Sequence, residues 1–313
     1  MIASNNDNRR QLTKFGWQGI SLTVPEQWGL VSTRGDYDSG FVALADEDTQ
    51  RLQIKWEEGN NDSDPSEAAN KYIRSLRKDY ESDEQELQVN RRLNLATLPD
   101  KKVECYDWIG ENRGTGMVSR CDDCHRMVHI VITGGPKESL RNLSRTVFAS
   151  LQDHAIEERI HWKFYDIEFY SPAELALKRS ELKTGCIRMQ FRRKSQEIEF
   201  VRSSLAQMLL KKQSLKEWFT DFYADKLKRK SWDISAENLK GHEGLMLTGR
   251  PWLICDPWGI VGTRKKLRVA CWHCQETNRI FVVGYGGRHN EHMLEDVVNS
   301  TVCCDEGNEN GIV

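Results

Sequence analysis

Two Cys-x-x-Cys pairs are the residues of this chain whose type and spacing point most directly to chemistry. Cys121 and Cys124 form the first pair, and Cys271 and Cys274 form the second, 150 positions later. Two thiolates at a turn can bind one ion, and four of them complete the tetrahedral site that zinc prefers. These four cysteines are therefore predicted to form a zinc site if the two pairs come together.

Two further ligand sets lie within one half of the chain. The first consists of Cys121, Cys124 and His125, with His154 or Cys105 as the fourth ligand. The second consists of Cys271, His273 and Cys274, with Cys303 or Cys304. The histidines stand at different places relative to the two pairs, which weakens the expectation of one shared histidine-containing site.

Ordinary core packing competes with these metal sites, and the sequence favours it. A free cysteine packs as a small apolar side chain, and residues three apart on a strand point to opposite faces of the sheet. A redox pair would lie at the start of a helix, where the thiol pKa falls, and neither pair precedes a helical pattern. We therefore expect no cofactor, with zinc as the alternative and thiol redox chemistry as a third choice.

Catalytic signatures are missing from the sequence. It contains no Gly-x-Ser-x-Gly elbow, Walker loop or His-Glu-x-x-His motif. His242 and Glu243 are adjacent, so on a strand they face opposite ways and do not form an acid–base pair. We expect no catalytic or cofactor-binding residues, and a non-catalytic binding or assembly protein that acts through contacts with another protein.

Positive charge is concentrated between Lys178 and Lys230, which holds 15 Lys or Arg against 6 Asp or Glu. One cluster consists of Arg192, Arg193 and Lys194. Such a face could meet a phosphate backbone, although a solvated surface is the commoner explanation and no nucleic-acid motif accompanies it. Nucleic-acid binding is therefore one alternative function, beside a zinc- or thiol-dependent module that uses the paired cysteines, and these three residues are candidate partner-binding residues.

Two tryptophans lie in a segment that has no close counterpart in the front half. Trp252 and Trp258 belong to the Pro-rich stretch from Arg250 onward. Loops held by a rigid scaffold often carry function. Both are therefore candidates for contact with a partner protein.

The order of elements is strands, helix, strands, helix, and it occurs twice. Alternating apolar residues predict strands, for example over residues 52–56. Asp64 followed by Pro65 predicts a helix start, and Ser214 with Glu217 forms a capping box that predicts another. We expect two tandem domains, residues 1–155 and residues 156–313.

Several segments resemble a Mog/PsbP-like domain. Gly19–Trp28, Gly40–Leu44 and Arg51–Trp56 are similar to the opening of that fold, and Gly241–Gly244 and Asn278–Val283 to its later strands. The resemblance implies an α+β class, with each domain a largely antiparallel sheet packed with helices. By analogy of fold it also implies a binding module.

Composition limits the remaining choices. The formal net charge of −2 does not favour a polyanion-binding protein, and 38% hydrophobic with 29% charged residues suits a globular chain. No apolar run approaches the roughly 20 residues of a membrane span, so no membrane partner is expected. Nine cysteines without a secretory signal favour reduced thiols and a cytoplasmic location.

Overall fold

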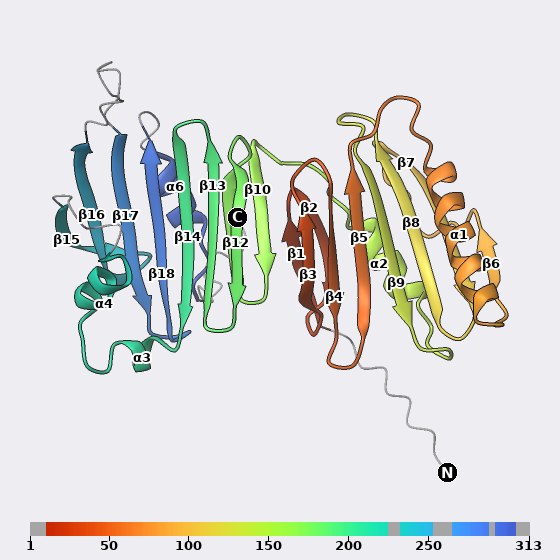
Figure 1. The fold of residues 1–313 in the computed structure, drawn as a ribbon, viewed down its shortest axis with the longest axis horizontal. Coiled ribbons are helices and arrows are strands. Elements are labelled where there is room, and N and C mark those ends of the chain that lie inside the picture. Colours follow the sequence, from red (N-terminus) through yellow and green to blue (C-terminus); the bar gives the residue numbers. More distant parts are fainter. Residues whose placement is uncertain (1–10, 225–231, 253–264, 288–291, 305–313) are drawn as a thin grey trace, which may run out of the picture. The chain divides into compact units, whose positions relative to one another are not determined.

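The computed structural model describes residues 11–224, 232–252, 265–287 and 292–304 (Figure 1). The chain divides into two compact units. Unit 1 comprises residues 1–155 and 163–165, and unit 2 comprises residues 156–162 and 166–313. None of the described helices is both long enough and apolar enough to span a membrane.

Unit 1 contains a hairpin and a seven-stranded antiparallel sheet. The hairpin is formed by β1 (Leu12–Trp17) and β2 (Ile20–Pro25). The sheet has the strand order β3 (Gly29–Gly35), β4 (Gly40–Ala45), β5 (Gln50–Glu57), β9 (Met127–Gly134), β8 (Arg113–Cys121), β7 (Lys101–Ile109) and β6 (Gln88–Arg91). Strand β9, the last of these in the sequence, thus joins a front meander (β3, β4, β5) to a back meander (β6, β7, β8).

Helix α1 (Pro65–Ser82) begins where the sequence predicts. The side chain of Asp64 accepts a hydrogen bond from the backbone N–H of Ser66 at 3.0 Å, and Pro65 occupies the first turn. The helix buries its apolar side against one face of the sheet. That core contains Ala69, Ile73, Tyr106, Trp108, Val118, Met127 and Val131.

Helix α2 (Arg141–Ala149) lies on the other face of this sheet (Figure 1). Alternation along the strands turns buried residues such as Met117 and Ile130 toward that face. The chain that leaves α2 then forms a β-bridge to the hairpin, between Ser21 and Gln152. This bridge fixes the position of the residues that follow.

Unit 2 has the same strand order. β10 (Arg159–Phe164) and β11 (Ile167–Pro172) form its hairpin. Its sheet has the order β12 (Ala176–Lys183), β13 (Cys186–Arg193), β14 (Gln196–Ser204), β18 (Arg279–Gly287), β17 (Lys265–Cys274), β16 (His242–Trp252) and β15 (Trp232–Leu239). Its described helices are α3 (Ala206–Leu209), α4 (Leu215–Phe222) and α6 (His292–Ser300).

The capping box at the start of α4 is confirmed. Oγ of Ser214 accepts from the N–H of Glu217 at 3.2 Å, and Oε2 of Glu217 accepts from the N–H of Ser214 at 2.7 Å. Trp218 and Phe219 of α4 pack in a core that also holds Cys271. Helix α6 contacts β11, β17 and β18 and buries its own apolar residues.

The prediction of a tandem α+β fold of the Mog/PsbP type is wrong. The described residues form eighteen strands and only five helices, and the sheets are antiparallel, so the chain is mainly β. The error arises at edge strands such as β12, whose exposed positions carry Lys, Arg and Ser. An edge strand tolerates charge because one side has no neighbour, and its sequence then lacks the alternation that marks a strand.

Candidate functional sites

Four side chains of unit 2 form a compact cluster of metal-binding atoms. The ligand atoms of His242, Cys274, Cys303 and Cys304 all lie within 4.8 Å of one another. Nε2 of His242 is 3.4 Å from Sγ of Cys303 and 3.5 Å from Sγ of Cys304. The sulfur atoms of Cys303 and Cys304 are 3.9 Å apart.

Neighbouring strands supply the first two members of this unit 2 cluster. His242 is the first residue of β16, and Cys274 is the last residue of β17. Gly244 pairs with Trp272 in the antiparallel register of these strands, so His242 lies opposite Cys274.

The other two members follow helix α6. Val302 forms a β-bridge with Glu168, and Cys303 and Cys304 come directly after it. The thiol of Cys274 donates to the carbonyl of Cys303 at 3.4 Å. Burial raises the pKa of the Cys303 thiol, and burial together with Cys303 raises the pKa of Cys304 to about 12. Both thiols are therefore neutral near pH 7 when no cation is bound.

Unit 1 has a second cluster, which contains Cys121, Cys124, Asp153 and His154. Nδ1 of His154 lies 3.7 Å from Sγ of Cys121 and 3.9 Å from Sγ of Cys124. Cys121 ends β8, and the chain turns at once, since the N–H of His125 donates to the carbonyl of Cys121. This turn brings the two thiols of the first Cys-x-x-Cys pair to the same side.

A lysine already neutralises the carboxylate of the unit 1 cluster. Nζ of Lys101 lies 2.7 Å from Oδ1 of Asp153, which is fully buried. Burial of Lys101 opposes its charge, but the hydrogen bond and charge of Asp153, together with Cys121, outweigh this and hold the lysine pKa above its usual value. The same Oδ1 atom lies 2.9 Å from Nδ1 of His154.

Cys271 is not in either cluster. It is fully buried in the α4 core, where burial raises the pKa of its thiol. Cys271 and Cys274 both belong to the regular strand β17, so they point to opposite faces. The second Cys-x-x-Cys pair therefore does not act as a pair.

Other candidate ligands from the sequence are also left out, and one residue was missed. Cys105, His125 and His273 belong to neither of the two clusters found in the described part of the chain. The sequence presents His242 only as a candidate acid or base. No spacing rule could have found it as a ligand, because it reaches Cys274 only through strand pairing.

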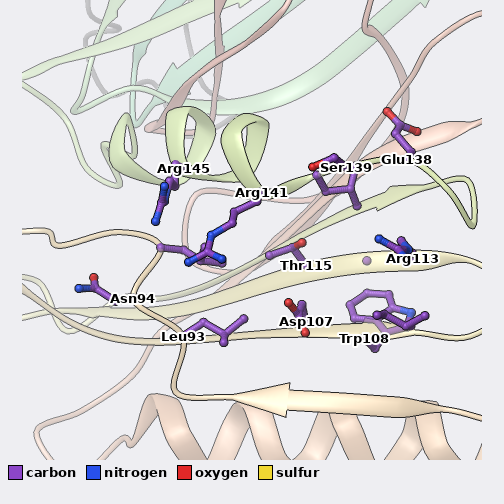
Figure 2. A pocket seen from close by; sticks show the side chains of 14 residues that line it. Leu93, Asn94, Asp107, Trp108, Arg113, Thr115, Glu138, Ser139, Arg141 and Arg145 are labelled. Carbon is purple, nitrogen blue, oxygen red and sulfur yellow. The ribbon is translucent and has the colours of Figure 1, made fainter.

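A pocket of about 400 Å³ lies in unit 1 between α2 and the back meander (Figure 2). Arg113 comes from β8, and Arg141 and Arg145 come from α2. In Figure 2, Arg141 and Arg145 extend from the helix toward the strand that carries Thr115. Apolar side chains complete the wall, among them Leu93, Leu95, Trp108, Ile109 and Leu140.

The carboxylates of this pocket have polar partners within the chain, and its arginines form no ion pair among the described residues. Asp107 accepts a hydrogen bond from Asn90 at 2.8 Å, and Glu138 pairs with Arg51. The three pocket arginines have no ion-pair partner within the part of the chain that the structure describes, and Nε of Arg113 is buried without a hydrogen bond. The pocket therefore holds an excess of positive charge beside apolar surface.

Five basic side chains of this region of unit 2 form ion pairs, namely Arg179, Lys183, Arg188, Arg193 and Arg202. Arg193 pairs with Glu174, and Arg202 pairs with Asp166. Nε of Arg188 lies 3.6 Å from Oε1 of Glu199. These contacts give nucleic-acid binding no support.

The remaining partner-binding candidates fall in different places. Arg192, Arg193 and Lys194 lie at the exposed hairpin turn between β13 and β14. Trp252 ends β16, and Trp258 lies outside the described residues. Arg193 lines a pocket of unit 2 together with Glu158 and Glu174, and its charge there is paired with Glu174.

No protein-family model matches the chain, and no curated protein matches it either. Among solved structures it is similar to the immunity protein TplEi of the T6SS from Pseudomonas aeruginosa. The structure of TplEi in complex with the "L" peptide has 11% identity and a TM-score of 0.34, covering 93% of this chain and 96% of that chain. The apo structure gives 10%, 0.32, 93% and 95%. At such low scores the similarity does not extend to function.

Proposed function

We propose that this chain is a non-catalytic binding protein that holds an acidic segment of a partner protein in the arginine-lined pocket of unit 1. One observation carries the proposal. Arg113, Arg141 and Arg145 reach a single pocket whose own carboxylates, Asp107 and Glu138, are already engaged.

Electrostatics favour a carboxylate ligand. Arg141 and Arg145 stand four positions apart on α2, and like charges at this spacing repel each other. A carboxylate placed between them relieves that repulsion and can accept paired N–H bonds from a guanidinium group. Helix α2 also begins without a side-chain cap or an acidic first turn, so its N-terminus presents further positive potential.

The apolar wall favours a peptide over a small inorganic anion. Trp108, Ile109 and Leu140 line the same pocket as the arginines. A peptide can place one carboxylate against the arginines while its neighbouring methylene groups contact this wall.

Binding of a labelled hexaglutamate peptide to the full chain tests the proposal, with hexaserine as the reference peptide. The double variant Arg141→Glu/Arg145→Glu should bind hexaglutamate at least about tenfold more weakly, because charged hydrogen bonds contribute roughly 1.5–3 kcal/mol each. The double variant Arg77→Glu/Lys78→Glu, which makes the same change of net charge at two exposed positions of α1, serves as the control and should bind like the wild type.

Two outcomes would refute the proposal. One is equal binding of hexaglutamate and hexaserine by the wild type. The other is equal loss of binding in Arg141→Glu/Arg145→Glu and in Arg77→Glu/Lys78→Glu, which would mean that only the net charge of the chain matters.

A further inference from the structure

We infer that unit 2 binds one zinc ion through His242, Cys274, Cys303 and Cys304. This site is independent of the arginine-lined pocket, which belongs to unit 1. The number, type and spacing of the four ligands each support the inference.

Three of the six distances between the ligand atoms match those within one tetrahedral site, and the three that involve Cys274 are at most 4.8 Å. Zn–S bonds of about 2.3 Å and Zn–N bonds of about 2.0–2.1 Å place two ligand atoms roughly 3.3–3.8 Å apart. The two distances from Nε2 of His242 to sulfur are 3.4 and 3.5 Å, and the Cys303–Cys304 sulfur distance is 3.9 Å. An ion at the centre of these atoms requires only small movements of the side chains.

The ligand types select zinc among the common divalent ions. Three thiolates with one imidazole form a soft set that magnesium and calcium avoid. Cys₃His is also an established composition of closed structural zinc sites. Ion binding would release protons from the thiols, because zinc binds the thiolate form.

The place of the site in the fold gives the ion a structural role. Cys274 closes β17, His242 opens β16, and Cys303 and Cys304 lie beyond α6. One ion would therefore tie two strands to the segment that leaves the last helix. Four protein ligands leave no open position for a substrate, so we assign no catalysis to the ion.

Unit 1 provides an internal comparison for this site. Lys101 is paired with Cys121 between β7 and β8, which is the place that His242 takes opposite Cys274. Asp153 follows its β-bridge residue directly, as Cys303 does in unit 2. In unit 1 an ammonium group thus faces a carboxylate at 2.7 Å, whereas unit 2 has an imidazole facing a thiol. Lys101 compensates the unit 1 cluster, and we assign the ion to unit 2.

Elemental analysis of the purified full chain tests the inference. The wild type should carry one zinc ion that is lost in Cys303→Ser and in His242→Gln. Cys124→Ser, which removes a thiol from the unit 1 cluster, is the matched control and should keep the same zinc content as the wild type. Circular dichroism of each variant verifies that it folds.

Cobalt substitution gives a second readout on the wild type itself. Cobalt(II) bound in place of zinc should show the intense near-ultraviolet absorption of cobalt–thiolate bonds, and Cys304→Ser should weaken it. Absence of zinc and of this absorption in the wild type would overturn the inference. Zinc that persists in both Cys303→Ser and His242→Gln, or that disappears only in Cys124→Ser, would overturn it equally.

A disulfide between the adjacent Cys303 and Cys304 is the main competing state. A disulfide needs its sulfur atoms about 2.05 Å apart, and here they are 3.9 Å apart. Alkylation followed by mass spectrometry separates the two cases. If a chelator alone makes Cys303 and Cys304 react with the alkylating agent, the metal site is supported. If they react only after a reductant is added, they form a disulfide and the metal site is refuted.

Discussion

Nε2 of His242 lies 3.4 Å from Sγ of Cys303, although 61 positions separate the two residues. The corresponding contact in unit 1 joins Lys101 to Asp153 over 2.7 Å, across 52 positions. Each contact ties the beginning of a strand to the segment after the last helix of its unit. The same place in the fold therefore holds an ion pair in unit 1 and a set of soft metal ligands in unit 2.

Removal of the ion should destabilise the wild type but not a chain that lacks the site. A strong chelator should lower the thermal unfolding midpoint of the wild type by several degrees, because binding to the folded state contributes to its stability. Cys303→Ser should unfold at one temperature with or without chelator. Differential scanning calorimetry measures both. A chelator response that is retained in Cys303→Ser would place the stabilising ion elsewhere.

The equal offset of 150 positions predicts that the two Cys-x-x-Cys pairs occupy equivalent places in their units, and the fold shows that they do not. Cys121 and Cys274 each end the strand before the last strand of their sheets, whereas Cys271 lies inside its strand and faces the α4 core. The equal offset of 150 therefore aligns a cluster residue with a core residue. Spacing along one strand cannot show which face a side chain occupies until the strand's ends are known.

Local chemistry made the helix starts predictable, while long-range pairing hid the site. Asp64 and Ser214 cap helices through bonds to residues two or three positions away, so the sequence alone contains the signal. His242 meets its partners through β16, β17 and the end of α6. The arginine-lined pocket was also missed, because β8 and α2 supply its charges from separate parts of the sequence.

A methyl group at Gly114 should disturb the packing of Trp108 beneath helix α1. Its Cβ would collide with the ring of Trp108, so Gly114→Ala should lower the free energy of unfolding by roughly 1–3 kcal/mol. Gly135→Ala is the control, since nothing lies within 4 Å of a Cβ added there. Urea unfolding compares the two variants. Equal stabilities would mean that Trp108 moves aside freely, and hexaglutamate binding would then reveal whether the pocket survives.

Loss of the Asp64 cap should weaken helix α1. The carboxylate accepts the N–H of Ser66 at 3.0 Å, and replacing such a cap by alanine costs about 1 kcal/mol. Asp62→Ala removes an exposed carboxylate two positions earlier and controls for the change of charge. Urea unfolding should distinguish the variants. A cost that is the same in both would assign the effect to general electrostatics and not to the cap.

His129 should make unit 1 less stable as the pH falls. Its Nε2 lies 2.6 Å from the hydroxyl of Tyr106, and its ring meets that of Tyr72 edge-on at 4.8 Å. Burial, with a smaller effect of Lys55, lowers the pKa of His129 from 6.5 to about 4. The residue reaches solvent in part, but its ring is enclosed by these aromatic neighbours.

The sign follows from which state takes up the proton. Between pH 6.5 and pH 4 an unfolded chain protonates His129 while the folded chain does not, so stability is fully present above pH 6.5 and decreases as the pH falls toward 4. The loss attributable to this residue between pH 7 and pH 4.5 should be roughly 2 kcal/mol. Urea unfolding of the wild type and of His129→Gln at pH 7 and pH 4.5 measures it as the difference between the two pH dependences. His292→Gln, a change at an exposed histidine, is the control and should retain the pH dependence of the wild type. If His129→Gln also retains that dependence, His129 of the folded wild type takes up its proton as readily as in the unfolded chain, which would contradict the prediction.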